Sequence, residues 1–165
     1  MRKLPVPYTN RFRVISQPIS VEREAGEKEF EKSKLHYEVI LSPSHTVKVN
    51  KIFNRMIRTL HIEKAKMNSD SVSHLDGLNW EILVVNKCYI ETYSHAGGKI
   101  VTIVASVQHH TDEELATILA HDVAHVVARH PAELKTNCTW LRFNKLKRRR
   151  ATNLSVNVYL FFKRH

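Results

Sequence analysis

Two stretches in the first half of the chain carry apolar residues at helical spacing. Residues 20–38 place apolar side chains at wide intervals among many charges, which predicts a surface helix with Gly26 as a weak point. Residues 45–66 predict an amphipathic helix, because their apolar positions mostly recur at i, i+3 and i+4 and basic residues fall between them. These apolar positions are Val47, Val49, Ile52, Phe53, Met56, Ile57 and Leu60.

The pattern changes in the middle of the chain from helical spacing to short β-branched runs. Residues 69–79 are rich in Ser, Asp, Asn and Gly and predict a loop. Strands are then predicted for residues 80–85 and 99–107. Residues 88–93 could form a third strand. Gly97 and Gly98 mark a turn, so residues 88–107 are expected to form an antiparallel hairpin.

The clearest helix start in the sequence follows these strands. Thr111 with Glu114 three residues later forms a capping box, and the acidic residues of this turn favour the positive end of the helix dipole. The helix is expected to run from residue 112 to residue 130, where Pro131 disfavours further helix. The predicted fold class is α+β, with two N-terminal helices, a small antiparallel sheet of two or three strands and a final helix, followed by an irregular basic tail.

The length of 165 residues fits one domain, and no apolar run is long enough to cross a membrane. Of the formal net charge of +10, nine Lys and Arg lie between Leu134 and His165, a stretch without acids. We therefore divide the chain into a domain over residues 1–133 and a basic tail over 134–165. The tail could bind an anionic membrane surface through charge, whereas nucleic acid is an unlikely partner for the chain as a whole. Cys88 and Cys138 predict free thiols.

The predicted final helix carries the residues with the strongest chemical signal. His121 and His125 stand one turn apart, so their imidazoles project from one face and can reach a single metal ion. Asp122 places a carboxylate beside the first histidine, where it could exchange a proton with a metal-bound water. Such a histidine pair alone also arises by chance on helix surfaces. Small apolar neighbours predict that this helix is buried, and buried histidines need partners.

Together with its surroundings, this helix resembles the zinc metalloendopeptidases related to the CAAX prenyl protease and to bacterial heat-shock membrane peptidases. Within them, the chain looks most similar to mitochondrial inner-membrane peptidases whose activity overlaps that of the m-AAA protease. The similarity covers roughly residues 5–133. Several segments carry it in the same order: Val6 to Arg11, Gly97 to Val101, Thr111 to Ala116, His121 to His125 and Ala128 to His130.

The resemblance implies a role for each matching position. His121 and His125 would bind one zinc ion, and Asp122 stands where the family has its catalytic Glu. The strand that begins at Lys99 would hold an extended protein or peptide substrate by β-augmentation. Its substrate-binding residues would be Gly98, Lys99, Ile100 and Val101. The resemblance also implies a mitochondrial location, associated with the inner membrane.

The chain departs from the family pattern in ways that predict a weakened or incomplete enzyme. The family takes its third zinc ligand from a Glu on a later helix, whereas the only acid after His125 is Glu133, beside the same helix. His130 lies about 180° around the helix from His121 and is expected to face away. Three further histidines remain open as ligands: His95, His109 and His110. The alternative is an inactive, C-terminally truncated peptidase-like protein, and the third ligand stays unidentified.

Overall fold

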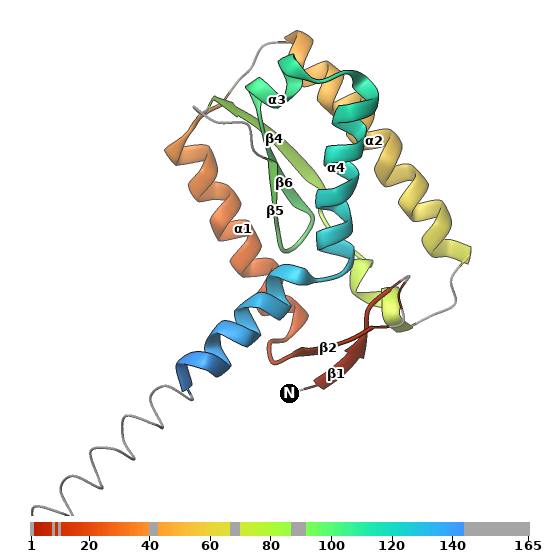
Figure 1. Cartoon of the computed structure of the whole chain (residues 1–165), viewed down its shortest axis with the longest axis vertical. Coiled ribbons are helices and arrows are strands. Elements are labelled where there is room, and N and C mark those ends of the chain that lie inside the picture. The colour runs from red at the N-terminus through yellow and green to blue at the C-terminus, as the bar shows by residue number, and fades with distance from the viewer. Residues whose placement is uncertain are drawn as a thin grey trace, which may run out of the picture.

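The computed structural model describes residues 2–7, 9, 11–39, 43–66, 70–86 and 92–143. Its elements are β1 (Arg2–Pro5), β2 (Phe12–Ile15), α1 (Ile19–His36), β3 (Glu38–Val39), α2 (Pro43–Lys66), the 3₁₀ helix η1 (Asp70–Leu75), β4 (Glu81–Asn86), β5 (Thr92–His95), β6 (Lys99–Ile103), α3 (Val104–His109) and α4 (Asp112–Val127). A further helical segment covers residues 130–143 and projects from the body of the molecule (Figure 1). The predicted α+β class is confirmed, and both N-terminal helices form.

A four-stranded sheet in the order β3-β4-β6-β5 forms the centre of the fold. The β5–β6 hairpin is antiparallel as expected, and Gly97 and Gly98 have φ values of 85° and 88° in its turn. The expectation of a fully antiparallel sheet is wrong, because β4 pairs with β6 in parallel. Residues 104–107, predicted as strand, begin α3 instead. The part of the expected third strand before Thr92 lies outside the described residues.

Alternate residues of the central strands face two separate apolar layers, as the strand period of two requires. Val84 and Ile100 pack with α2, α3 and α4 in the larger core cluster. Val85, Val101 and Ile103 face the other way and pack with Phe30 of α1. The sheet therefore lies between α1 on one face and the α2–α4 pair on the other, and α4 crosses in front of the strands in Figure 1.

Gly26 in α1 has a packing role that its helix propensity does not reveal. A Cβ built on Gly26 would overlap the backbone carbonyl of Ala96 in the β5–β6 turn. The absence of a side chain thus lets α1 lie directly against the hairpin. Gly26 is weak in helix propensity, but this close approach requires glycine at the position.

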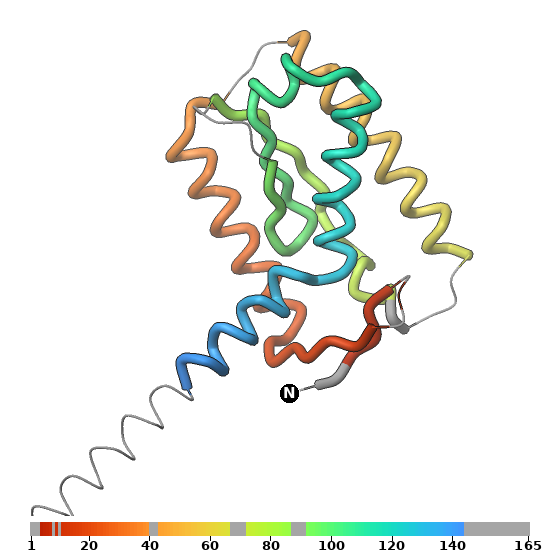
Figure 2. Tube along the Cα trace, viewed as in Figure 1, coloured from red at the N-terminus to blue at the C-terminus, as the bar shows by residue number. Residues whose placement is uncertain are grey.

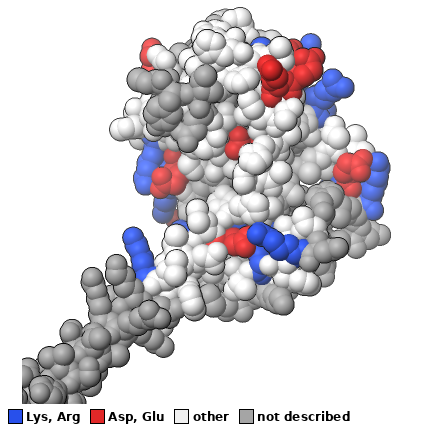
Figure 3. Space-filling model, viewed as in Figure 1, with Lys and Arg blue, Asp and Glu red and all other residues white. Residues whose placement is uncertain are grey.

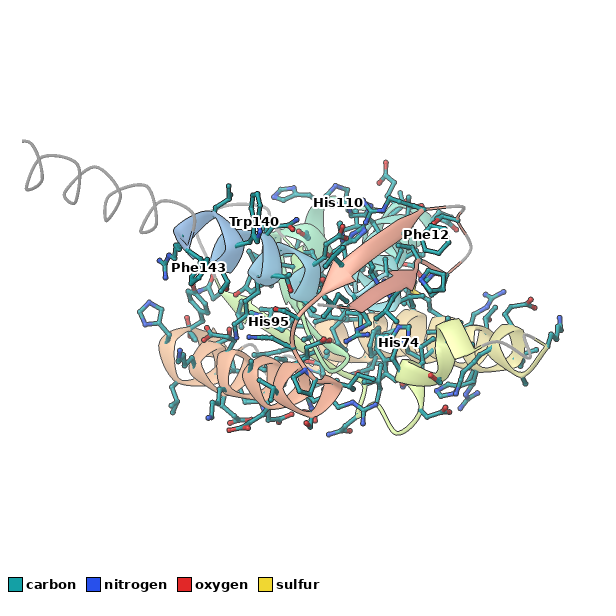
Figure 4. The ribbon with its side chains drawn as sticks, turned by 90° about the horizontal axis from the view of Figure 1, so that it is seen from below. Phe12, His74, His95, His110, Trp140 and Phe143 are labelled. Atoms are coloured by element: carbon teal, nitrogen blue, oxygen red, sulfur yellow. The ribbon has the colours of Figure 1, made fainter. Side chains whose placement is uncertain are left out.

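The first part of the predicted irregular tail is helical. Residues 134–143 continue the helix that begins at residue 130, and Trp140 and Phe143 extend from it largely into solvent (Figure 4). Cys138 on this segment is an exposed free thiol. Cys88 and the basic run at 145–150 lie outside the described residues. On the face shown in Figure 3, charged side chains gather toward the margins of the described surface and leave its centre largely uncharged.

Candidate metal centre

The helix that carries the histidine pair is fixed at its start by the predicted capping box. The Thr111 hydroxyl accepts a hydrogen bond from the Glu114 amide, and the Glu114 carboxylate accepts one from the Thr111 amide. Leu115, Leu119 and Val123 then bury one face of α4 in the core. These contacts set the rotation of the helix, so that His121 is exposed, His125 is half-buried and Asp122 is buried.

His121 and His125 approach each other on the outer side of α4. Their Nε2 atoms are 2.9 Å apart, and their ring centroids are 4.4 Å apart with nearly perpendicular planes. Two zinc-bound imidazole nitrogens at tetrahedral angles would be separated by about 3.3 Å, given Zn–N bonds of about 2.0–2.1 Å. A small rotation of either ring would therefore place both nitrogens on one zinc ion, and the pair fits two corners of a tetrahedral site.

Burial, followed by the positive charges that His121 and His130 can carry, lowers the pKa of His125 below its ordinary value. A lowered pKa keeps this imidazole neutral at physiological pH, and the neutral form is the one that binds metal. The local electrostatics therefore agree with the geometry of the pair.

His130 lies against His125, contrary to the expectation that it faces away. Its Nδ1 is 2.6 Å from the Nδ1 of His125, and the two ring centroids are 4.8 Å apart. The expectation failed because it extended one continuous helix to residue 130, whereas α4 ends at Val127. The signal was present in the sequence as Pro131, which occupies the first turn of a new helix rather than a position after the last one.

Two side chains bind the carbonyl groups left free at the end of α4. His74 of η1, labelled in Figure 4, places its Nε2 2.8 Å from the Val127 carbonyl oxygen. The guanidinium of Arg13 on β2 donates to the Ala128 carbonyl. Both side chains are buried. Figure 2 shows the N-terminal strands and the end of α4 at the same end of the molecule. Segments far apart in sequence therefore cap the helix that carries the histidine pair.

Arg129 makes the turn that separates the two helices. Its φ of 51° lies in the left-handed region, which favours glycine or asparagine at the residue after a helix. The Arg129 guanidinium forms a bidentate ion pair with Glu22 of α1, and its Nε donates to Glu22 Oε2 at 3.0 Å. Both side chains are more than nine-tenths buried. Spacing within the sequence gave no sign of this pair, which joins residues 107 positions apart.

Asp122 is the buried carboxylate of the site. It is only 5% exposed, and burial raises its pKa to about 6, although the neighbouring His121 opposes that shift. A carboxyl group with a pKa just below neutrality is suited to general-base chemistry, because it is ionised at pH 7 and yet accepts a proton readily. Its environment thus agrees with the role implied by the sequence.

An apolar groove of about 750 Å³ opens beside the histidine pair. Its walls come from the residues between β1 and β2, from the second half of α2, and from α4 and the residues that follow it. The apolar lining includes Val6, Pro7, Met56, Leu60, Val123 and Val127, while His121, His125 and His130 border it. The groove is therefore large enough for side chains of a bound polypeptide and lies directly at the candidate metal ligands.

A third ligand does not join the pair within the part of the chain that the structure describes. No group of three or more His, Cys, Asp or Glu side chains there is arranged to hold a metal ion. His130 contacts the Nδ1 side of His125, whereas the pair faces through Nε2. Glu133 pairs with Arg11 at 2.5 Å. Among the other candidates, His95 lies on β5, His109 is exposed on α3 and His110 binds the Ser106 carbonyl oxygen.

The residues predicted to bind substrate lie in the interior of the sheet. β6 is paired with β4 on one side and with β5 on the other, so Lys99, Ile100 and Val101 have no free edge for an added strand. Lys99 is buried, and its ammonium pairs with Glu81 and Glu27. Gly98 adopts a positive φ and packs against Trp80. The substrate-edge prediction for these four positions is wrong, because β4 adds to the strand from a distant part of the sequence.

Comparison with known proteins identifies the family of this site. The model of peptidase family M48 matches residues 43–142, which include α2, the sheet strands β4 to β6 and all of α4. The chain belongs to peptidase family M48. The match to this M48 chain extends beyond residue 133, the end that we predicted for the peptidase-like domain. The domain boundary at residue 133 stays a prediction.

Three curated relatives of this M48 chain are named mitochondrial metalloendopeptidase OMA1. The Arabidopsis thaliana protein is 40% identical over 77 residues, which cover 46% of this chain and 16% of the relative. The Saccharomyces cerevisiae protein is 33% identical over 138 residues, 79% of this chain and 38% of the relative. The Schizosaccharomyces pombe protein is 27% identical, over 78% of this chain and 35% of the relative. This M48 chain thus spans less than two fifths of the length of these relatives. Within its described residues, no helix combines the length and apolarity of a membrane span.

Proposed function

We propose that this chain carries the catalytic helix of a zinc-dependent metalloendopeptidase, with His121 and His125 as ligands of one zinc ion. The observation that carries the proposal is the 2.9 Å approach of their two Nε2 atoms, on a capped helix inside the M48 match. When bound, zinc would polarise a water molecule and lower its pKa to about 7. The protein supplies two imidazoles, a buried carboxylate and an adjacent apolar groove.

Asp122 is the general base in this proposal. Its carboxylate accepts a proton from the attacking water and returns it to the departing amine of the cleaved peptide. Burial supports this role, because it raises the pKa of Asp122 to about 6. The side chain is one methylene shorter than the Glu that the resemblance implies, which retracts the carboxylate by about 1.5 Å. We therefore expect slow rather than efficient proton transfer.

The substrate is a protein or peptide in an extended conformation. β5 is the terminal strand of the described sheet on the side away from β3, and it packs beside α4. A substrate strand could therefore pair with β5 instead of β6 and present its scissile bond toward α4. The apolar groove beside the histidines would accommodate apolar side chains next to that bond.

A mitochondrial location, associated with the inner membrane, is part of the proposal and is supported by the names of the three relatives. The basic run at residues 145–150 would contribute through attraction to anionic lipid. Binding to anionic vesicles should then fall with added salt and disappear when this run is neutralised. Salt-independent binding would contradict the contribution of the tail.

A catalytically inactive peptidase-like protein is the second candidate. It is favoured because no third protein ligand accompanies His121 and His125 among the described residues. The presence of Asp122 in place of Glu points in the same direction. In this case the chain would retain the fold and the apolar groove, and it would bind zinc weakly or not at all.

Elemental analysis of purified protein separates the two candidates. The metalloendopeptidase proposal predicts near one zinc per chain, and the double variant His121→Ala, His125→Ala should lose it. His109→Ala is the matched control, since it removes an exposed imidazole on α3. Casein cleavage that a chelator abolishes would then establish activity. Absence of zinc from the unsubstituted chain, or cleavage that survives the chelator, would contradict the proposal.

A further inference from the structure

The arrangement of the three histidines assigns different tasks to the two nitrogens of His125. Its Nε2 faces His121 Nε2 at 2.9 Å, and its Nδ1 faces His130 Nδ1 at 2.6 Å. A neutral imidazole carries one proton, so a ring that offers the lone pair of Nε2 to a metal must carry its proton on Nδ1. That N–H needs an acceptor, and His130 Nδ1 is the ring atom placed to receive it.

We propose that His130 is a positioning residue of the metal centre, which accepts a hydrogen bond from His125 Nδ1 and thereby directs His125 Nε2 toward the metal. The inference rests on the proposed zinc site and adds a residue that does not itself bind the ion. Metal-bound histidines generally donate their second ring N–H to such a partner, which fixes both the tautomer and the ring orientation.

The backbone around His130 is organised to bring this side chain back to α4. A continuous helix would carry residue 130 away from His125, whereas the left-handed turn at Arg129 reverses its direction. The buried ion pair with Glu22 holds Arg129 in that conformation, which residues other than glycine seldom adopt. Arg13 and His74 hold the carbonyls just before the turn. Side chains from three other elements thus support the contact between the two histidines.

Substitution of His130 tests this role through zinc affinity. The affinity is measured by competition with a chromophoric chelator, and circular dichroism checks the fold of each variant. His130→Leu removes the acceptor and should weaken zinc binding by about 10- to 100-fold, the usual range for such partners. His130→Asn places an oxygen acceptor near the position of Nδ1 and should bind zinc with nearly the affinity of the unsubstituted chain.

Imidazole nitrogen NMR provides a second readout that a merely structural residue would not affect. In the zinc-loaded protein the His125 proton should lie on Nδ1, and in metal-free His130→Leu the preference for this tautomer should be lost. Unchanged zinc affinity and an unchanged tautomer in His130→Leu would overturn the role of His130 and leave the zinc site intact. Failure of the unsubstituted chain to bind zinc through His121 and His125 would instead overturn the proposed function, and this inference with it.

Discussion

At the scale of single residues, the length of the Asp122 side chain limits how far its carboxylate reaches from α4. A misplacement of about 1 Å can reduce the rate of a catalysed step by roughly 10²-fold. Asp122→Glu extends the carboxylate by about one C–C bond and should raise casein cleavage by up to this factor. The rate is measured with equal zinc loading, and Asp122→Asn serves as the control without a base. If Asp122→Glu gives no gain, the defect lies in the missing third ligand rather than in the base.

His95 on β5 supports a separate prediction about pH, because it lines a pocket with residues of α1 and not the groove beside His121 and His125. Burial lowers its pKa below the ordinary value, against the opposing charge of Glu29, and its Nε2 is buried without a hydrogen-bond partner among the described residues. The unfolded chain therefore binds a proton more readily at this site than the folded chain does. The contribution of His95 to stability is present above about pH 6.5 and is lost as the pH falls through the lowered pKa.

Urea unfolding between pH 8 and pH 5 measures this effect, with a chelator present to keep the protein metal-free. The unsubstituted chain should lose more free energy of unfolding on acidification than His95→Gln, in which the titrating group is absent. His109→Gln is the control, because His109 is exposed. Parallel pH profiles for His95→Gln and the unsubstituted chain would show that His95 does not contribute.

At this scale, sequence spacing predicted the proximity of His121 and His125 but not the residues around them. His121 and His125 are four positions apart, so their proximity follows from the helix period alone. The contact of His130 depends on a left-handed residue at position 129, and the partner of Arg129 is 107 residues away. Such long-range pairs leave no local pattern, and they are the part of the site that required the structure.

At the scale of elements, helix propensity and packing predict opposite effects of substituting Gly26. Propensity alone predicts that Gly26→Ala stabilises α1 by about 1 kcal/mol. The structure predicts the opposite, because the added Cβ would overlap the Ala96 carbonyl and push α1 away from the hairpin. We expect a loss of about 1–3 kcal/mol in the free energy of unfolding, the usual cost of overpacking.

Chemical denaturation of Gly26→Ala checks this sign directly. Lys28→Ala on the exposed side of the same helix is the matched control, since its side chain is exposed and its ion pair with Glu24 lies at the surface. Equal or greater stability of Gly26→Ala would mean that α1 can shift without cost. The comparison also tests the position of α1 over the hairpin, which a propensity argument does not address.

The elements themselves were predictable to different degrees. The predicted start of α4 was correct, because a capping box is a local signal. The predicted β5–β6 hairpin was correct, because two glycines mark its turn. The side on which β4 joins β6 was not predictable, because β4 and β6 are not consecutive strands. A parallel neighbour changes which strand is the edge, so the prediction that the strand beginning at Lys99 is an edge was wrong.

At the scale of the whole molecule, distant parts of the chain meet at the end of α4. Glu22 reaches it from α1, Arg13 from β2 and His74 from η1. Unfolding of the whole chain therefore breaks the contacts that hold the turn between α4 and His130. A metal ion bound by His121 and His125 would bind the folded state only, so its binding free energy should appear as stability of the entire fold.

Thermal unfolding with and without zinc tests this coupling. At zinc concentrations about 100-fold above the dissociation constant, the folded state should gain about 2.7 kcal/mol. For a chain of this size that gain corresponds to a rise in Tm of roughly 5–11 °C. The double variant His121→Ala, His125→Ala should show no rise, and the His109→Ala control should behave as the unsubstituted chain. An equal rise in the Tm of the double variant would mean that zinc binds elsewhere. The candidate metal centre would then not be the source of the stabilisation.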